Sequence, residues 1–343
     1  MNFSSDNAYG AAPEILQAIE AANTGAMRSY GDDPLTGRLS AEMARVFERP
    51  VSVFPVITGT AANALALAAI TPSHGTVFCH RAAHIATDEC GAPEFFTHGA
   101  KLVTVDGRHG KLDAEQLEDR LHDFVRGCVH HSQPAAISIS QSTEFGACYL
   151  PEETRRLALF ARDGGMKLHM DGARFANAVA HLGCTPAEAT WKAGVDVLSF
   201  GATKNGALAA EAVVFFDPEE ARDFEFRRKK SGHLLSKMRF VSAQLVCALE
   251  QDRWLAWAAR ANALARHLSG QLESAPGVEI ACPVEANAVF ARMPDATVRR
   301  LRDHGASFYD WAAPASGLTL VRLVTSFATP ESDIERLVAI ARN

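Results

Sequence analysis

Two charged residues follow short apolar segments and could act together in catalysis. Asp171 follows the segment 167–170, and Lys204 follows the segment 195–200 through a loop of small residues. Both segments have the composition of buried strands, and residues that follow parallel strands meet at one edge of a sheet. A lysine amine can bond to the aldehyde of pyridoxal phosphate, while a carboxylate can keep the pyridine nitrogen protonated so that the ring accepts electrons. The pair therefore predicts a pyridoxal phosphate enzyme.

The sequence around these residues alternates segments with strand and helix patterns. The predicted strands are 51–57, 76–79, 102–105, 135–140, 167–170, 195–200 and 212–216, and the predicted helices include 35–48, 113–125 and 151–162. Such alternation is typical of an α/β fold with a mostly parallel sheet, in which ligands bind beyond the carboxyl ends of the strands. Pro55 indicates that the strand 51–57 lies at a sheet edge or bends.

The turn after the strand 51–57 could bind a phosphate group. Its residues 58–63 are small and precede a helix rich in alanine and leucine. The N–H groups and the dipole at such a helix start favour an anion. The lysine and second glycine of a P-loop are missing, and from the residues alone a plain N-cap for the next helix is the alternative interpretation.

Composition excludes several other classes of protein. The chain has 343 residues, 48% of them hydrophobic and 22% charged, with a net charge of −6, which is ordinary for a globular protein and gives no general attraction to nucleic acid. We find no apolar run long enough for a membrane span and no signal-peptide pattern, so the cytoplasm is the expected location. Seven cysteines without CxxC spacing and 13 histidines without an HExxH pair indicate neither disulfides nor a metal site.

The length favours two domains, which we predict at 1–240 (an N-terminal arm and a large cofactor-binding domain) and 241–343 (a small domain). In the second domain, the segment 240–275 looks helical. Further strands are predicted at 288–292, 307–311 and 318–323, with helices near 295–304 and 331–341. Arg322 lies in an otherwise apolar strand, where it could bind a substrate carboxylate or form a structural salt bridge with a neighbouring Asp or Glu.

Several segments, in order along the chain, carry a resemblance to a known family. They are SSDN (4–7), YGDD (30–33), TGTAAN (58–63), AH (83–84), DECG (88–91), HMDGAR (169–174), TKNG (203–206) and LVRLVT (320–325). With them the chain resembles the low-specificity L-threonine aldolases, which are pyridoxal phosphate enzymes of fold type I, the aspartate-aminotransferase-like fold. The resemblance implies a large domain with a mostly parallel, seven-stranded type of sheet between helices and a smaller C-terminal α+β domain.

The resemblance also implies which residues contact the cofactor. They are Gly59, Thr60, His84, Asp171, Arg174, Thr203, Lys204 and Lys230. Gly59 and Thr60 would bind the phosphate. The family brings a cation to this phosphate from the basic segment 227–230, often across a subunit contact, and Arg228 is a candidate beside Lys230. A charge run of this kind also fits a solvated helix face.

For catalysis, the resemblance implies Lys204, His84, His131 and Asp171, and for substrate binding it implies Ser5, Arg174, Arg322 and Tyr30. The family places His84 over the cofactor ring near the substrate hydroxyl, where a histidine can accept and return a proton. A lone histidine at a helix start is otherwise a surface or capping residue. His131 matches a second histidine near the substrate. The chain departs from one branch of the family by having Glu144 in place of a histidine.

The implied activity is cleavage of L-threonine, L-allo-threonine or a related β-hydroxy-α-amino acid, such as phenylserine, to glycine and an aldehyde. Another fold-type-I enzyme, a β-eliminating lyase or a racemase, would use the same lysine and aspartate and is the alternative. A non-catalytic relative would lack the lysine or the phosphate turn, and a dinucleotide-binding dehydrogenase would have a GxGxxG motif. The family also implies a homodimer or homotetramer with shared active sites.

Overall fold

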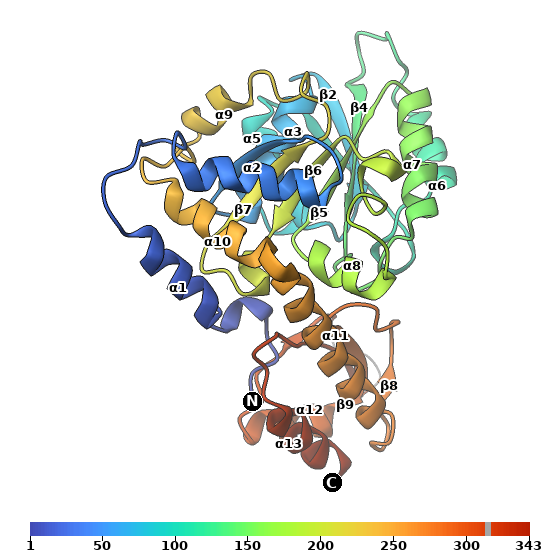
Figure 1. Cartoon of the computed structure of the whole chain (residues 1–343). Helices are drawn as coiled ribbons and strands as arrows, with labels where there is room; N and C mark the ends of the chain where they lie inside the picture. Colours follow the sequence, from blue (N-terminus) through green and yellow to red (C-terminus); the bar gives the residue numbers. More distant parts are fainter. Residues whose placement is uncertain (313–316) are drawn as a thin grey trace.

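The computed structural model describes residues 1–312 and 317–343. The described chain forms two bodies, each built around one sheet, and the long helix α11 runs from the first body into the second (Figure 1).

The larger sheet has seven strands in the order β1-β7-β6-β5-β4-β2-β3. Its strands are β1 (Ser52–Val56), β2 (Gly75–His80), β3 (Lys101–Val105), β4 (Gln133–Ser140), β5 (Lys167–Gly172), β6 (Val197–Gly201) and β7 (Glu211–Phe215). Only β7 runs antiparallel to its neighbours β1 and β6. The predicted α/β fold is confirmed, and β1 lies at the edge of the sheet, as Pro55 indicates.

Helices cover both faces of this sheet. On one face α3 packs against β5, β6 and β7, and α5 and α9 pack on α3. On the other face, apolar residues of α2, α6, α7, α8 and α10 share one core with the strands. These helices, with the neighbouring α1 and α4, are α1 (Pro13–Ala22), α2 (Pro34–Val46), α3 (Gly59–Ile70), α4 (His84–Thr87), α5 (Ala92–Phe96), α6 (Ala114–Leu121), α7 (Pro151–Asp163), α8 (Phe175–Leu182), α9 (Phe224–Lys230) and α10 (Arg239–Leu249).

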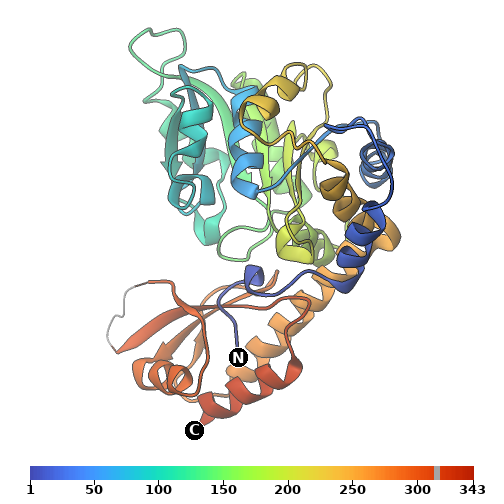
Figure 2. The same ribbon diagram turned by 90° about the vertical axis from the view of Figure 1, so that its left-hand side faces the viewer.

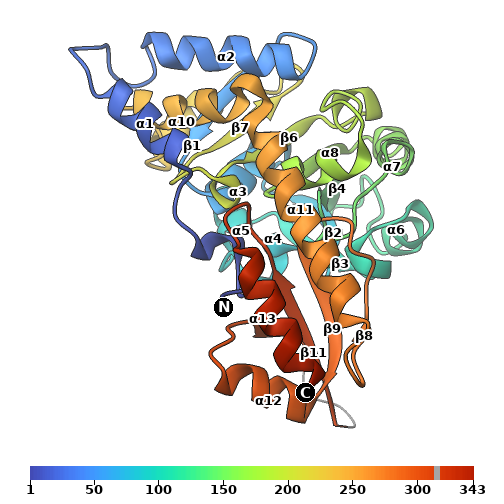
Figure 3. The ribbon, with the colours of Figure 1, turned by 60° about the horizontal axis from the view of Figure 1, so that its bottom comes forward.

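The smaller sheet is antiparallel, in the order β10-β11-β9-β8, and the helices α11, α12 and α13 cover one of its faces (Figure 3). Its elements are β8 (Glu279–Ile280), β9 (Ala288–Pro294), β10 (Tyr309–Asp310), β11 (Leu318–Val324), α11 (Arg253–Leu272), α12 (Asp295–Asp303) and α13 (Glu331–Arg342). The N-terminus lies against this body (Figure 2). The Phe3 backbone N–H donates to the Ser307 carbonyl at 2.8 Å, and Phe3 is buried in the core of this body. The domain boundary near residue 240 stays a prediction.

The segment 240–275 is largely helical, as predicted, but it forms two helices with a break between them. The chain leaves the helical conformation at Gln251 and Asp252, whose φ angles are +56° and +53°. This left-handed turn separates α10 from α11, and Trp254 then stacks on Phe175 with a distance of 6.1 Å between ring centroids. Among the described helices, none combines the length and the apolar composition needed to cross a membrane.

Candidate active site

Asp171 lies near the carboxyl end of β5, where its side chain is buried and fixed on both oxygens. Oδ1 accepts a hydrogen bond from the backbone N–H of Ala173 at 2.9 Å, and Oδ2 accepts one from Nδ2 of Asn63 at 2.8 Å. Asn63 comes from α3, on the face of the sheet opposite to α8. A carboxylate held in this way is rigid and can fix a positively charged ring nitrogen.

Lys204 follows the neighbouring strand β6 in a single 3-10 turn, Thr203–Asn205, and Oγ1 of Thr203 accepts from the Ala210 N–H at 3.2 Å. Gly201 allows the close approach of this turn to the one after β5, since a Cβ atom there would lie 2.7 Å from Cα of Ala173. Burial lowers the pKa of Lys204, and the nearby guanidinium of Arg174 lowers it further, although three carboxylates oppose both effects. A lowered pKa leaves more of the amine neutral, which is the form that attacks an aldehyde.

His84 begins α4 and is linked to Asp171 through two side chains, because Glu89 contacts the imidazole and Asn63 donates both to Glu89 at 2.9 Å and to Asp171 at 2.8 Å. The charge of Lys204 lowers the pKa of His84, and that of Asp171 raises it. Nδ1 of His84 lies 2.8 Å from Oε1 of Glu89, and this hydrogen bond raises the pKa of the imidazole. The backbone N–H of His84 donates to Oε1 of Glu144 at 3.0 Å. The imidazole is thus placed as a proton acceptor that Glu89 and Asn63 link to Asp171.

The start of α3 offers an anion site at the same edge of the sheet. Thr58 is the N-cap, and its side chain accepts from the N–H of Ala61, so the N–H groups of Gly59 and Thr60 have no described partner. No described atom lies within 4 Å of the position that a Cβ on Gly59 would occupy. Thr58 is therefore an N-cap, as the alternative interpretation of this turn predicts. The N–H groups of Gly59 and Thr60 are still available to bind a phosphate. Together with Lys204 and Asp171, this donor set fits pyridoxal phosphate.

A second group of residues could hold a substrate carboxylate. Nε and Nη2 of Arg174 donate to the two oxygens of Asp6 at 2.8 and 2.9 Å, and Ser5 is the next residue on the same arm. Despite burial, which acts in the opposite sense, Arg174 and Lys204 hold the pKa of Asp6 below its usual value. Nη1 of Arg174 has no described partner.

Arg322 completes this group from the smaller body. Val321 and Leu323 of β11 lie in the core under the helices, so Arg322 projects from the other face, where its guanidinium lies 4.8 Å from the ring centre of Trp311. Nε is buried without a hydrogen-bond partner, and no carboxylate of the described chain forms a salt bridge with the side chain. Burial lowers the pKa of Arg322, and the charge of Arg174 adds to this effect. A buried guanidinium without a salt bridge among the described residues favours a bound anion.

Other predicted residues lie outside this group. His131 precedes β4 at the opposite end of the strand from Ser140, and its Nδ1 accepts from the backbone N–H of Val125 at 3.0 Å. His131 is therefore no part of this site within one chain, because the active-site edge is formed by the carboxyl ends of the strands.

Tyr30 and the basic segment have no described contact with Lys204 or Asp171, although Arg228 donates to the Pro55 carbonyl, three residues before the turn at Thr58. Tyr30 is 49% exposed, and Nζ of Lys229 lies 4.5 Å from its ring centre. Arg228 is buried against the ring of Phe54 at 5.4 Å, while Lys230 is exposed at the end of α9. The choice between Arg228 and Lys230 as a phosphate ligand stays open, although Nη1 of Arg228 already donates to the Pro55 carbonyl of the edge strand β1 at 3.4 Å.

Three functional residues were not singled out by sequence reasoning. Asn63 and Asp6 lie in segments that carry the family resemblance, but they have the appearance of a helix residue and a capping residue. Glu89 lies in the DECG segment, and only its placement five residues after His84 hints at a contact. In the structure all three bind a predicted site residue directly.

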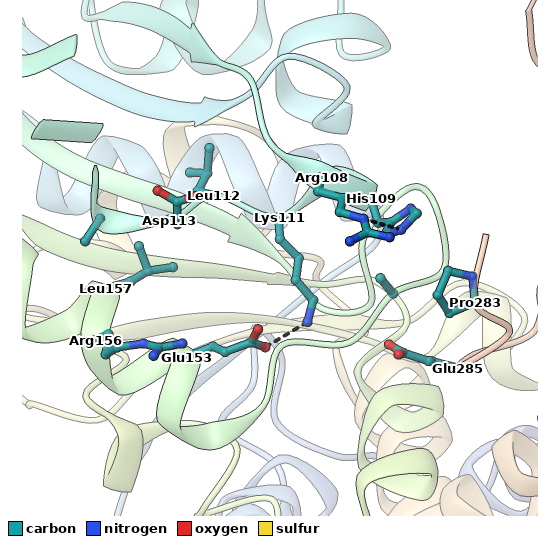
Figure 4. Close-up of a pocket in the computed structure, with 12 residues that line it drawn as sticks. Arg108, His109, Lys111, Leu112, Asp113, Glu153, Arg156, Leu157, Pro283 and Glu285 are labelled. Carbon is teal, nitrogen blue, oxygen red and sulfur yellow. Dashed lines mark hydrogen bonds and ion pairs between the residues drawn. The ribbon is translucent and has the colours of Figure 1, made fainter. Parts of the chain in front are cut away.

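A separate cavity of about 490 Å³ lies at the border of the two bodies (Figure 4). It is lined by residues of the loops after β3 and β4, of α7 and of the β8–β9 loop, including Lys111, Glu153 and Glu285. Lys111 and Glu153 form an ion pair with a distance of 2.7 Å. None of the predicted site residues lines this cavity, so it is distinct from the group around Lys204.

Comparison with known proteins agrees with the geometry. Residues 2–296 match the family model described as beta-eliminating lyase. The chain is 44% identical to the low specificity L-threonine aldolase of Pseudomonas sp. (strain NCIMB 10558) over 340 residues, which cover 99% of this chain and 96% of that protein.

Two solved structures are similar over almost the whole chain. The threonine aldolase of Leishmania major has a TM-score of 0.93 at 26% identity, covering 99% of this chain and 98% of that one. An aspartate aminotransferase from Rhodobacter sphaeroides shares the fold, with a TM-score of 0.71 at 20% identity and coverage of 100% and 91%. The predicted fold type is thereby confirmed. The chain belongs to the low-specificity L-threonine aldolases of the beta-eliminating lyase family.

Proposed function

We propose that this chain is a pyridoxal phosphate-dependent aldolase, a carbon–carbon lyase that converts β-hydroxy-α-amino acids such as L-threonine, L-allo-threonine or phenylserine to glycine and an aldehyde. The observation that carries the proposal is the position of His84, a proton acceptor that Glu89 holds and that Glu89 and Asn63 link to Asp171. Aldol cleavage needs a base for the β-hydroxyl proton at this position, in addition to the lysine and aspartate that every enzyme of the fold type requires.

Each residue of the site has a defined task in this proposal. Lys204 is the attachment point, and its lowered pKa supplies the neutral amine. Gly59 and Thr60 bind the phosphate through backbone N–H groups, and Asp171 retains the proton on the pyridine nitrogen. The chemistry that pyridoxal phosphate supplies when bound is an electron-accepting ring for the electron pair of the Cα–Cβ bond.

The substrate is oriented through its carboxylate. Arg322 contributes an unpaired guanidinium, Arg174 contributes its free Nη1, and Ser5 lies beside them on the arm. Two charged donors fix the carboxylate more firmly than one, which orients the Cα–Cβ bond for cleavage. His84 then accepts the hydroxyl proton at Nε2, directly or through a water molecule.

Product analysis with L-threonine tests this function. The aldolase forms acetaldehyde and glycine, whereas β-elimination forms 2-oxobutyrate and ammonia, and racemisation forms the D-enantiomer with no cleavage. We expect acetaldehyde and glycine in equal amounts. Formation of 2-oxobutyrate as the main product would assign the chain to the eliminating chemistry instead.

Replacing His84 with asparagine is expected to leave cofactor binding intact and to lower kcat for threonine cleavage by roughly 100-fold, the typical contribution of a general base. The measurement is steady-state kinetics together with the visible absorbance of the purified protein. His122→Asn, which alters an exposed histidine of the same chain, is the control. Unchanged kcat in His84→Asn would move the base to another residue.

Replacing Arg322 with lysine is expected to raise KM for threonine by roughly 10-fold or more, because the planar fork of hydrogen-bond donors is lost while the charge is kept. Arg292→Lys on the neighbouring strand β9 is the matched control, since Arg292 forms a surface ion pair with Glu279. Equal KM values for the two variants would show that Arg322 does not bind the substrate.

We further propose that the chain works in the cytoplasm as a homodimer or homotetramer with shared sites. Exposed Tyr30 and Lys229 contact each other outside the group around Lys204, which supports a role for this surface in the site of a second copy. Sedimentation of the purified protein gives the number of copies. A monomer with full activity would contradict shared sites.

A further inference from the structure

One side of the His84 imidazole is fixed and the other is open. Nδ1 lies 2.8 Å from Oε1 of Glu89, whose side chain is fully buried, while the His84 side chain is 41% exposed. Nε2 has no described polar partner. The residue therefore has one ring nitrogen anchored in the protein and the other without a described partner.

The partners of Glu89 indicate which nitrogen carries the proton. Oε1 also accepts from Nδ2 of Asn63 at 2.9 Å, and this same amide nitrogen donates its other hydrogen to Asp171 at 2.8 Å. Oε2 of Glu89 is buried without a partner, so a proton placed there would have no acceptor among the described residues. Burial raises the pKa of Glu89, and the contact with His84 opposes this rise. The arrangement is best satisfied when Oε1 only accepts and Nδ1 of His84 donates.

We propose that Glu89 is a positioning residue: its carboxylate holds the proton of His84 on Nδ1 and so presents the lone pair of Nε2 to the substrate hydroxyl. The inference rests on the proposed aldolase function for the identity of that substrate. Through Asn63 the same carboxylate is linked to Asp171, so that the base and the ring-nitrogen ligand are oriented by one network.

The charged groups around His84 set the direction of its pH dependence. The hydrogen bond that His84 donates to Glu89 raises the pKa of His84, burial and the charge of Lys204 lower it, and Asp171 raises it. Glu144 accepts from the backbone N–H of His84 and from the Ser140 hydroxyl, and it has no described hydrogen bond with the imidazole. Because His84 must be deprotonated to accept a proton, kcat/KM increases as the pH rises through its pKa. Removal of the Glu89 charge lowers the pKa of His84, so the rise of kcat/KM on the acid side of the pH profile moves to lower pH.

The direct test is a titration of His84 by NMR in the full-length protein containing isotope-labelled histidine, with His84→Asn to assign the resonance. We expect Glu89→Gln to lower the pKa of His84 relative to the unmodified protein, and Glu115→Gln, at an exposed position of α6, to leave it unchanged. An identical titration midpoint in Glu89→Gln would overturn the proposal. If Glu89→Gln does not fold, Glu89→Asp decides, since withdrawing the carboxylate by one methylene should also lower the pKa.

The kinetic counterpart is the pH profile of threonine cleavage. We expect Glu89→Gln to lower the plateau of kcat by at least about 10-fold with little change in KM, and to shift the acid limb to lower pH. A residue with a merely structural role would lower the rate without moving the limb, and that result would also overturn the proposal. The NMR titration needs no substrate, so a wild-type protein that fails to cleave threonine would refute the proposed function without deciding the role of Glu89.

Discussion

The Lys204→Ala protein is expected to be colourless and to cleave threonine at least about 1,000-fold more slowly than the unmodified protein, because it has lost the amine that bonds to the cofactor. No other described lysine is placed to substitute: Lys204 is the lysine whose pKa burial lowers beside Asp171 and Arg174. The measurements are the visible absorbance after incubation with pyridoxal phosphate and the rate of acetaldehyde formation.

Lys192→Ala is the control for this experiment, because Lys192 lies on the surface and pairs with Glu48 at 2.6 Å. It should retain both the colour and the rate. Cleavage by Lys204→Ala at a rate close to that of the control would show that the reaction does not depend on this amine.

The Asp171→Ala protein is expected to bind the cofactor more weakly and to lose roughly 100- to 1,000-fold in kcat. The carboxylate is the buried group positioned to keep a pyridine nitrogen protonated, and a ring without that proton is a poor electron acceptor. Removing it also takes away one of the two acceptors of the Asn63 amide. Cofactor titration by absorbance and steady-state kinetics measure the two effects.

Asp171→Asn separates charge from structure. The amide has the same shape, but its single oxygen can accept from only one of the two donors, Asn63 or the Ala173 N–H, and its NH2 group must face the other. We therefore expect Asp171→Asn to fold with an unfolding temperature a few degrees lower than that of the unmodified protein and to be impaired like Asp171→Ala. Wild-type kinetics in Asp171→Asn would remove the aspartate from its assigned role.

The elements that carry this chemistry were predictable because their signals are local. The apolar segments around 167–170 and 195–200 are short and bounded by charged or small residues, and both became buried strands. Pro55 likewise identified an edge strand from its missing N–H group. By contrast, the break between α10 and α11 uses Gln251 and Asp252 in a left-handed conformation, with no glycine or proline to indicate it.

The contacts within the site could be predicted less well, since they join residues far apart in the chain. Arg174 was expected to bind substrate, and the structure adds that Asp6 of the N-terminal arm already occupies two of its nitrogens. Asn63 lies in a helix whose other residues are almost all apolar, so its role in bridging Glu89 and Asp171 depends on tertiary packing alone. His131 lies before β4, at the end of the strand away from Ser140, and its role near the substrate stays a prediction.

The most direct test of the central claim is to reduce the cofactor-loaded protein with borohydride, digest it, and locate the modified lysine by mass spectrometry. The account predicts one modified peptide, carrying the phosphopyridoxyl group on Lys204. Modification of a different lysine, such as Lys229 or Lys230, or the absence of any modified peptide, would contradict it.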